Sequence, residues 1–384
     1  MTHRMHVALL CTNLFNIDEH NKTGSGIFDH ILIHSLAKLQ PPGFDMTVFA
    51  SGESSTLPAR VVSVDEKPSS ADQAMLAHGK HGMFELALLS KAFSMQETFD
   101  LYHVNIGDGD LAMPFAALVG KPIVITLHNI VNEPFTRKYF SLFQDCTNVF
   151  FISTSAYQRT MLPALQYVDT IYHGIDTDRY PLDPRGGRDI MWAGRLIPGK
   201  GPDTALRLAK KVKRTIKLFG VVKDGYQMWY ERAVRRQVKT AEDRSLVSIH
   251  ENLDRSKLIP HYRSSKLFVL PTVLEEAFGL VFVESMACGT PVIAYARGSG
   301  PEIIRDGETG FLVNPSDGDI RGDWIVKRTG FSGLCEAVDR VYAMAPQEYY
   351  RMRQACRKRA VEHFSAERMA RLYFDVYARL TDKT

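Results

Sequence analysis

The sequence predicts an α/β protein made of two doubly wound, Rossmann-like domains in tandem. Its 384 residues are enough for two domains. Apolar runs of strand length alternate with helix-length segments along the chain, which is typical of βαβ units and parallel sheets. The alternation pauses at a turn-rich stretch and then restarts. We therefore expect a first domain over residues 1–180, a linker over 181–188, a second domain over 189–365 and a C-terminal helix within 366–384 that packs on the first domain.

In the first domain, apolar runs predict strands, and helical patterns occupy the longer segments between them. The expected strands are His6–Leu10, Met46–Ala50, Arg60–Val64, Leu101–Val104, Pro122–Leu127, Val149–Ile152 and Thr170–Tyr172. The expected helices are Phe28–Leu39, Met83–Phe93 and Tyr157–Leu162.

The second domain repeats this pattern. The expected strands are Ile190–Ala193, Thr215–Gly220, Leu246–His250, Lys266–Leu270, Pro291–Ala294 and Gly310–Val313. The expected helices are Pro202–Val212, Gln227–Thr240, Arg255–Tyr262, Gly279–Ala287, Gly330–Ala343 and Pro346–His363, followed by the closing helix Ala366–Leu380. Because such sheets bind ligands at the carboxyl ends of their strands, two facing domains would hold the ligand in a cleft between them.

Composition narrows the class of protein. Hydrophobic residues make up 45% and charged residues 23%, which is typical of a globular protein and excludes dominant disorder. No apolar run approaches the roughly 18 residues that span a bilayer, and the short run Met5–Leu10 does not read as a signal peptide. The five cysteines form no CxxC pair, so we expect free thiols and a cytoplasmic location.

Charge is distributed unevenly between the two halves. Residues 1–180 carry 12 Lys+Arg against 18 Asp+Glu, whereas residues 181–384 carry 35 against 25. A basic second half suits an anionic ligand. Nucleic acid is not expected as a partner, because no basic stripe interleaved with aromatic residues is present. The acidic first half does not favour peripheral contact with a membrane.

Chemistry-bearing residues are densest between Pro271 and Val313. A strand is expected to end at Leu270, a polar loop then carries Glu276, and a helix is expected to begin near Gly279. Free backbone amides at such a helix start form a site for anions and hydroxyl groups. Glu284 follows Glu276 by eight residues, about 12 Å along a helix. That distance suits the two ends of a nucleotide sugar, but the same spacing arises often by chance, and Glu284 could equally be an ordinary half-buried polar residue.

This block resembles the E-x7-E signature of the retaining nucleotide-sugar glycosyltransferases of family 4 (group 1), which adopt the two-domain GT-B fold. The similarity includes Phe-Gly-Leu, Gly-Thr-Pro-Val-Ile-Ala and Pro-Glu-Ile-Ile. It implies that Glu276 contacts the donor hexose and that Glu284 contacts the ribose hydroxyls. It also implies that the amides near Phe278, Gly279 and Leu280 hold the sugar and the phosphates.

Two basic residues follow the first strand of the second domain. Arg195 and Lys200 lie within Gly194-Arg195-Leu196-Ile197-Pro198-Gly199-Lys200-Gly201. Two cations at the carboxyl end of a strand can neutralise a diphosphate and stabilise it as it leaves. Taken alone, they could equally be solvated residues in a turn. The sequence matches the family pattern Gly-Arg-Leu-x-x-x-Lys-Gly, which favours the diphosphate site.

The first domain contributes candidates of its own. Gly24, Ser25 and Gly26 precede a helix, and the resemblance implies that this loop contacts the donor; a glycine pair in a surface loop is the alternative. His128 ends an expected strand, where a structural histidine is common, but the family often keeps a histidine near the reacting sugar. Asp108-Gly109-Asp110 is read as a loop and not as a metal site.

The resemblance as a whole implies a retaining glycosyltransferase with Glu276, Arg195, Lys200 and His128 as its catalytic residues. It would transfer a hexose, with no metal or other cofactor, from a nucleotide sugar to an unidentified hydroxyl acceptor. The stretch Met46–Thr56 is similar to one found in some members that use UDP-glucose, so UDP-glucose is the expected donor. The sequence does not indicate the oligomeric state.

Three other functions stay open. The first is another GT-B enzyme, such as a sugar-nucleotide epimerase or a phosphorylase. The second is a sugar-nucleotide-binding subunit without turnover. The third is a dinucleotide oxidoreductase, for which the sequence lacks a GxGxxG loop followed by an acidic residue about 20 positions later.

Overall fold

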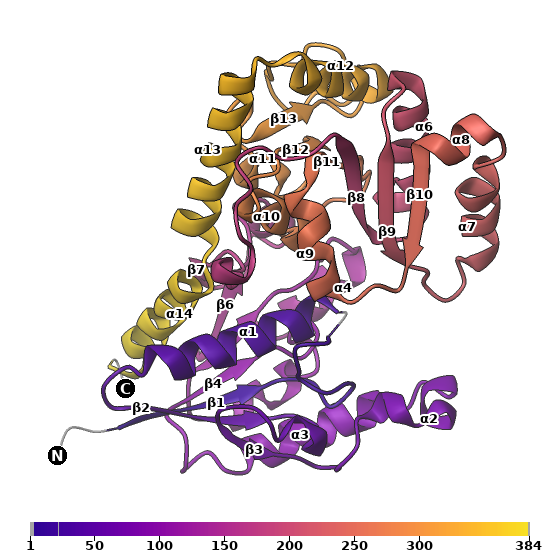
Figure 1. Cartoon of the computed structure of the whole chain (residues 1–384). Coiled ribbons are helices and arrows are strands. Elements are labelled where there is room, and N and C mark those ends of the chain that lie inside the picture. The colour runs from indigo at the N-terminus through magenta and orange to yellow at the C-terminus, as the bar shows by residue number, and fades with distance from the viewer. Residues whose placement is uncertain (1–3, 22, 383–384) are drawn as a thin grey trace. The chain divides into compact units, whose positions relative to one another are not determined.

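Two parallel sheets organise the chain, and each belongs to its own structural unit (Figure 1). The computed structural model describes residues 4–21 and 23–382, so the ends of the predicted first domain and closing segment, 1–3 and 383–384, lie outside the described residues. The first unit comprises the described residues of Met1–Gly174 and Ala366–Thr384, and the second comprises Ile175–Ser365.

The first unit contains a seven-stranded parallel sheet with the strand order β3-β2-β1-β4-β5-β6-β7. Its strands are β1 (Met5–Leu10), β2 (Phe44–Phe49), β3 (Arg60–Val62), β4 (Leu101–Val104), β5 (Ile123–Thr126), β6 (Val149–Ser153) and β7 (Tyr167–Thr170). The order reverses between β1 and β4, which is the topological switch point of a doubly wound sheet.

The second unit contains a six-stranded parallel sheet with the strand order β10-β9-β8-β11-β12-β13. Its strands are β8 (Asp189–Arg195), β9 (Ile216–Val221), β10 (Val247–Glu251), β11 (Ser265–Leu270), β12 (Val292–Tyr295) and β13 (Gly310–Val313). Here the order reverses between β8 and β11. The α/β, doubly wound architecture predicted from the sequence is confirmed in both units.

Helices cover the sheets of both units. The first unit has α1 (Gly24–Leu39), α2 (Gln73–Ala77), α3 (Gly82–Phe93), α4 (Pro134–Ser141), α5 (Ala156–Met161) and the C-terminal α14 (Ala366–Thr381). The second has α6 (Pro202–Val212), α7 (Gln227–Ala233), α8 (Ala241–Leu246), α9 (Arg255–Arg263), α10 (Leu280–Ala287), α11 (Gly300–Ile303), α12 (Gly330–Ala343) and α13 (Pro346–Phe364). In the second unit, α12 packs against α6, and α10 packs against both α9 and α13.

Alternation along β1 builds two cores in the first unit. Val7 and Leu9 face one core with α1 and α14, whereas Ala8 and Leu10 face the other with α3. Successive side chains of a strand point to opposite faces, so a fully apolar strand is covered by helices on both sides.

The C-terminal helix α14 completes the first unit, although it follows the second unit in sequence. It lies beside α1 (Figure 1), and its tyrosines reach into the core. The Tyr373 hydroxyl lies 3.0 Å from Thr126 Oγ1, and the Tyr377 hydroxyl lies 2.7 Å from His103 Nδ1. These bonds satisfy polar groups that burial would otherwise leave unpaired.

The boundary between the units lies at Gly174–Ile175, ahead of the predicted linker 181–188. Two arginines of α13 explain the difference, because their side chains fasten the preceding segment to the second unit. Arg357 donates to the carbonyls of Thr177 and Tyr180, both at 2.8 Å. Arg353 donates to the carbonyl of Asp183 at 2.6 Å.

The expected helix Gln227–Thr240 is wrong as one continuous element. The helix α7 ends at Ala233, where Val234 adopts φ −120° and ψ −67°, outside helical geometry. A new helix, α8, starts after Thr240. Thr240 and Asp243 form a reciprocal capping box there, so this helix starts just after the predicted one ends.

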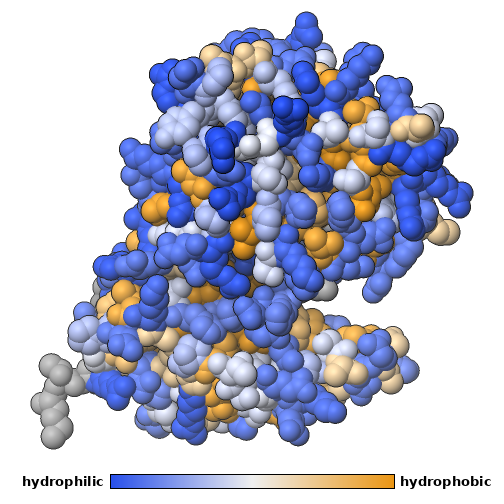
Figure 2. Space-filling view, viewed as in Figure 1, coloured by the Kyte–Doolittle hydropathy of each residue, from blue (hydrophilic) through white to orange (hydrophobic). Residues whose placement is uncertain are grey.

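The visible face of the molecule carries mainly hydrophilic side chains over the elements of both units (Figure 2). Among residues 4–21 and 23–382, no helix combines the length and the apolar character needed to cross a membrane.

Arg353 generates a stability prediction, because it is fully buried and forms no ion pair with a carboxylate of the described residues. Its guanidinium also donates to the carbonyls of Ser265, Arg263 and Cys288, at 3.0 to 3.1 Å. Arg353→Met would leave these acceptors buried without a donor, so we expect the free energy of unfolding of the second unit to fall by about 3–5 kcal/mol. Tryptophan fluorescence during urea unfolding measures this unit alone, since all three tryptophans lie in it: Trp192, Trp229 and Trp324.

The matched control is Lys358→Met on the same helix, where the side chain is 74% exposed. We expect it to change the free energy of unfolding by less than about 0.5 kcal/mol. Equal effects of the two substitutions would contradict the structural role given to Arg353.

Candidate functional site

The strongest candidate site lies at the switch point of the second sheet. Ligands of doubly wound sheets bind at the carboxyl ends of the strands where the order reverses. Lys200 follows β8 and Glu276 follows β11, the two strands that flank this point. Two of the predicted site residues, 76 positions apart in the sequence, therefore lie at the same edge of the sheet.

A glycine-rich turn positions Lys200. The 3₁₀ turn Pro198–Lys200 is followed by Gly201, whose φ of +67° favours glycine, and a Cβ there would lie 2.4 Å from the Pro271 carbonyl oxygen. The Gly199 carbonyl accepts hydrogen bonds from Val273 N at 2.9 Å and Thr272 Oγ1 at 3.1 Å. The turn after β8 is thus held directly against the loop after β11.

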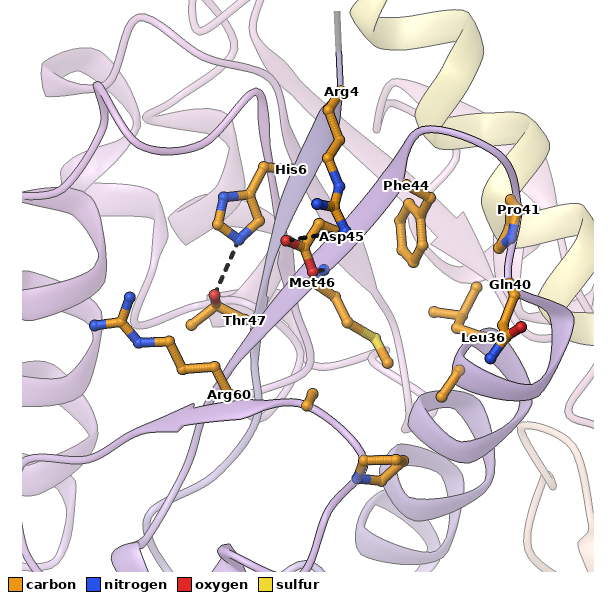
Figure 3. Close-up of a pocket in the computed structure, with 13 residues that line it drawn as sticks. Arg4, His6, Leu36, Gln40, Pro41, Phe44, Asp45, Met46, Thr47 and Arg60 are labelled. Carbon is orange, nitrogen blue, oxygen red and sulfur yellow. Dashed lines mark hydrogen bonds and ion pairs between the residues drawn. The ribbon is translucent and has the colours of Figure 1, made fainter.

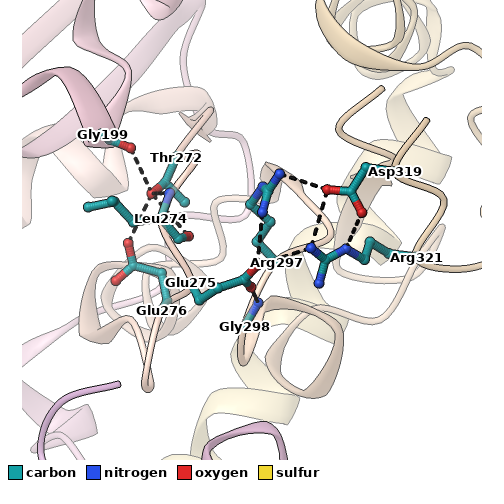
Figure 4. A network of polar contacts seen from close by, with 9 residues as sticks. All are labelled: Gly199, Thr272, Leu274, Glu275, Glu276, Arg297, Gly298, Asp319 and Arg321. Atoms are coloured by element: carbon teal, nitrogen blue, oxygen red, sulfur yellow. Dashed lines mark hydrogen bonds and ion pairs between the residues drawn. The ribbon is translucent and has the colours of Figure 1, made fainter. Parts of the chain in front are cut away.

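Lys200 and Glu276 form an ion pair through Nζ and Oε1. Their side chains are only 13% and 11% exposed, so water screens the pair weakly. Thr272 Oγ1 lies 3.2 Å from the same carboxylate oxygen, so its one hydrogen is shared between Glu276 and the Gly199 carbonyl (Figure 4). Lys200, which was predicted to bind the diphosphate, and Glu276, which was predicted to bind the sugar, are thus in direct contact.

The backbone of Glu276 rests on Gly298. Gly298 has φ +52°, and a Cβ there would lie 2.3 Å from the Glu276 carbonyl oxygen and 2.4 Å from its nitrogen. The next residue, Ser299, donates its N–H to that carbonyl at 2.9 Å. Only glycine allows the two backbones to come this close, so the turn after β12 fixes the position of the Glu276 backbone.

The start of α10 provides the helix tip that was predicted near Gly279. Gly279 adopts φ +84° as the N-terminal cap and offers no side chain to the amides of the first turn, which begins at Leu280. Phe278 is buried, and its carbonyl accepts the Ser299 hydroxyl at 2.6 Å. Uncapped amides at a helix N-terminus attract anions through hydrogen bonding and the helix dipole.

Glu284 lies on the same helix but is only 3% exposed. Arg255 Nε donates to its Oε1 at 2.6 Å. Burial, together with the nearby Glu284 carboxylate, raises the pKa of Tyr180, so this phenol stays protonated. The ribose contact of Glu284 remains a prediction. Arg255 was not among the predicted site residues, because no local signal links it to a carboxylate 29 residues later.

Arg195 ends β8 with an exposed side chain. Within residues 4–21 and 23–382 it takes part in no ion pair. An unpaired guanidinium at this edge keeps its full capacity to bind a phosphate, whereas Lys200 is already engaged.

A second polar network, also missed from the sequence, lies beside Glu276. Glu275 and Asp319 alternate with Arg297 and Arg321 in a set of ion pairs (Figure 4). The four residues come from three separate loops. Their spacing in sequence carries no recognisable pattern.

In the first unit, the predicted glycine loop forms the start of α1. Thr23 caps this helix by accepting a hydrogen bond from Gly26 N at 3.3 Å. Gly26 is buried, and a Cβ there would lie 2.4 Å from Asn21 Oδ1, so a larger residue would have to displace the Asn21 side chain. Gly24 is exposed with open space around it, and Ser25 is half-buried.

His128 follows β5 at the same end of this sheet. Its ring lies 4.9 Å from the Phe28 ring and 5.7 Å from the His173 ring. Both ring nitrogens are buried and have no hydrogen-bond partner among the described residues. Burial lowers the pKa of His128 to about 4, although Asp108 partly opposes this effect. Unpaired buried nitrogens are costly and are more typical of a functional site than of a structural histidine.

Asp108 fixes the backbone that carries His128. Its Oδ1 accepts the N–H groups of His128 and Asn129, at 2.8 and 3.0 Å, and its Oδ2 accepts Asn129 Nδ2 at 2.9 Å. Across the part of the chain that the structure describes, no three His, Cys, Asp or Glu side chains are grouped as metal ligands would be.

A cavity of about 650 Å³ lies elsewhere in the first unit, lined by Arg4, His6, Phe44, Asp45 and Arg60 among others (Figure 3). These residues stand at the amino ends of β1, β2 and β3. This is the opposite end of the strands from the one where doubly wound sheets bind ligands, so the cavity is not the candidate site.

Comparison with known proteins finds similarity over the region that holds the candidate site. A model of the family described as glycosyl transferases group 1 matches residues 178–320, which include both loops of the candidate site. The D-inositol 3-phosphate glycosyltransferase of Mycobacterium sp. (strain KMS) is 34% identical over 172 residues, covering 41% of this chain and 37% of that protein. D-inositol 3-phosphate glycosyltransferase 2 of Catenulispora acidiphila is 31% identical over 193 residues, covering 45% and 44%. The chain therefore spans about two fifths of the length of these relatives.

Solved structures resemble the chain over nearly its whole length. Sucrose-phosphate synthase from Thermosynechococcus elongatus superposes with a TM-score of 0.74 at 18% identity, covering 99% of this chain and 100% of that one. The Anabaena protein HepE, in complex with UDP and glucose, superposes with a TM-score of 0.70 at 18% identity, covering 98% and 100%. These likenesses show the fold, which is the GT-B fold predicted from the sequence.

His128 generates a prediction about pH. A histidine whose pKa falls from about 6.5 to about 4 on folding leaves the stability unaffected above pH 6.5. It destabilises the fold increasingly as the pH falls toward 4, because the unfolded chain then binds a proton that the folded chain excludes. The free energy of unfolding should then drop by up to about 1.4 kcal/mol per pH unit for this group. His128→Phe keeps the ring packing but cannot titrate. We therefore expect it to reduce the pH dependence of unfolding, followed by circular dichroism in urea between pH 7 and 4.5. The buried His103 and His173, whose pKa values are also lowered, supply part of the remaining dependence.

His78→Gln, at an exposed position, is the control and should leave that dependence unchanged. A His128→Phe variant that loses stability with falling pH as steeply as the wild type would show that His128 is not held neutral by burial.

Proposed function

We propose, on the premise that residues 178–320 belong to glycosyl transferases group 1, that this chain transfers a hexose from a nucleotide sugar to a hydroxyl acceptor. The observation that carries the proposal is the contact between Lys200 and Glu276 at the switch point of the second sheet. One group is suited to a diphosphate and the other to sugar hydroxyls, and both adjoin the uncapped start of α10.

Donor binding would exchange the partners of this ion pair. A diphosphate approaching Arg195 and the tip of α10 offers Lys200 more negative charge than one carboxylate does. Once Lys200 turns to the phosphate, Glu276 is free to accept hydrogen bonds from the hexose hydroxyls. Recognition of the diphosphate and recognition of the sugar would therefore be coupled through a single pair of side chains.

We propose that the reaction retains the anomeric configuration by substitution on one face of the sugar. The acceptor oxygen bonds to the anomeric carbon while the bond from that carbon to the diphosphate oxygen breaks. The acceptor's proton passes to the departing diphosphate, so no separate base is needed. Arg195, Lys200 and the α10 amides stabilise the charge that develops on the leaving group, which is the role a metal ion plays in other enzymes.

UDP-glucose is the proposed donor. The stretch Met46–Thr56 resembles one in members that use this donor, and the structurally similar HepE has been crystallised with UDP-glucose. His128 and the Gly24–Gly26 turn are proposed to serve the same reaction from the first unit. The hydroxyl compound that accepts the hexose is left open.

Glu276→Gln tests the proposal most simply. It removes the carboxylate charge from the hexose site, so we expect transfer, or slow donor hydrolysis measured without acceptor, to fall by at least a hundredfold. It also releases Lys200, so UDP should bind at least as tightly as to the wild type by calorimetry. That retained binding shows that the site is still folded.

Glu348→Gln, an exposed glutamate of α13, is the matched control and should behave as the wild type. Near-normal turnover of Glu276→Gln would refute the assignment of the hexose site. Wild-type protein that binds UDP but never turns over any UDP-, GDP- or ADP-sugar would point instead to a binding subunit.

Arg195→Ala tests the leaving-group site. Because Arg195 is exposed and unpaired, its loss should leave stability unchanged while raising the Kd for UDP roughly ten- to a hundredfold, as expected for loss of a charged hydrogen bond. Arg236→Ala, an exposed arginine of the same unit, is the control. The wild-type Kd should be the same with EDTA present. An unchanged Kd in Arg195→Ala, or a Kd that rises sharply in EDTA, would contradict a diphosphate held by cationic side chains.

A further inference from the structure

Glu275 and Glu276 are adjacent in sequence, but their side chains point in opposite directions (Figure 4). Glu276 turns toward Thr272 and Lys200, where the donor site is proposed. Glu275 turns toward the loops that follow β12 and β13. A residue that anchors the far side of a catalytic loop is well placed to set its geometry.

Glu275 makes three contacts with these loops. Its Oε1 accepts Arg297 Nη1 at 2.8 Å and Arg321 Nη2 at 3.1 Å. Its Oε2 accepts the backbone N–H of Gly298 at 2.6 Å. The backbone of Gly298 also packs directly against the backbone of Glu276. Glu275 therefore fixes the turn that positions Glu276, the next residue in the chain.

Asp319 closes the network from the other side. Its Oδ2 accepts Arg297 Nη2 at 2.7 Å, and its Oδ1 accepts Arg321 Nε. Asn314 organises this loop in turn, because its Oδ1 accepts Arg321 N at 2.7 Å. Two carboxylates and two guanidiniums balance in charge, so the network has no surplus charge with which to bind the donor.

We propose that Glu275 is a positioning residue for the transfer reaction and acts through Glu276, an inference that rests on the proposed function. Glu275 clamps the Gly298 turn, the turn fixes the Glu276 backbone, and the Glu276 carboxylate is thereby set against the hexose. Arg297 is the partner that orients Glu275.

The network should matter more for geometry than for stability. The side chains of Glu275 and Arg297 are each 18% exposed, and those of Asp319 and Arg321 are 28% and 31% exposed. Without Glu275, both arginines keep Asp319 as a partner, so the one surplus positive charge is shared by two partly exposed guanidiniums. A misplacement of about 1 Å at a reacting centre, by contrast, costs on the order of a hundredfold in rate.

Glu275→Gln is the test, with the full-length chain, UDP-glucose as donor and hydrolysis or transfer as the reaction. The amide cannot accept all three hydrogen bonds, so we expect kcat to fall roughly ten- to a hundredfold. The KM for UDP-glucose and the Kd for UDP should stay within about threefold, since the diphosphate groups are untouched. The midpoint of urea unfolding should match that of the wild type.

Glu336→Gln is the matched control, because Glu336 also pairs with an arginine in the second unit, at 2.9 Å, with its side chain 21% exposed. It should leave kcat unchanged. Glu275→Gln overturns the inference if its kcat stays within twofold of the wild type. It also overturns it if kcat, UDP affinity and unfolding midpoint decline together, as a merely structural role requires. A wild-type chain without turnover on any nucleotide sugar would refute the proposed function and this inference with it.

Discussion

The ion pair between Lys200 and Glu276 is the contact on which the chemistry proposed for the second unit depends. It joins the turn after β8 to the loop after β11, the two strands at which the sheet reverses its order. The glycines around it serve this approach: Gly201 admits the Pro271 carbonyl, and Gly298 admits the backbone of Glu276. Because both side chains are largely buried, removing either partner would leave the other as a poorly solvated charge, whereas a bound diphosphate would supply Lys200 with a new partner.

The strand pattern could be predicted from the sequence except at β7, which was expected at Thr170–Tyr172 and lies at Tyr167–Thr170. Parallel strands that are covered on both faces appear in the sequence as continuous apolar runs. Their positions can therefore be recognised without knowing which strands pair. The Gly-Arg-Leu-x-x-x-Lys-Gly and E-x7-E motifs likewise identified Lys200 and Glu276, since each motif is local. Their meeting across 76 residues follows once the strand order is known.

What escaped prediction depends on contacts distant in sequence. Arg255 pairs with Glu284 and Glu275 pairs with Arg297, and neither pairing has a periodicity that a linear pattern can reveal. The break near Val234 was hidden because helical periodicity runs on through Thr240, where a capping box starts a new helix. Likewise, nothing near residue 180 shows that Arg353 and Arg357 bind that segment to α13.

The central claim is that a nucleotide diphosphate binds beside Lys200 and Arg195 and opens the Lys200–Glu276 pair. A crystal structure of the chain with UDP-glucose tests it most directly. We predict diphosphate oxygens within hydrogen-bonding distance of Lys200 Nζ, the hexose against Glu276, and a longer distance between Nζ and Oε1 than in the free protein. A diphosphate bound elsewhere, for example in the cavity near Arg4 and Arg60, with the Lys200–Glu276 pair still closed, would contradict it.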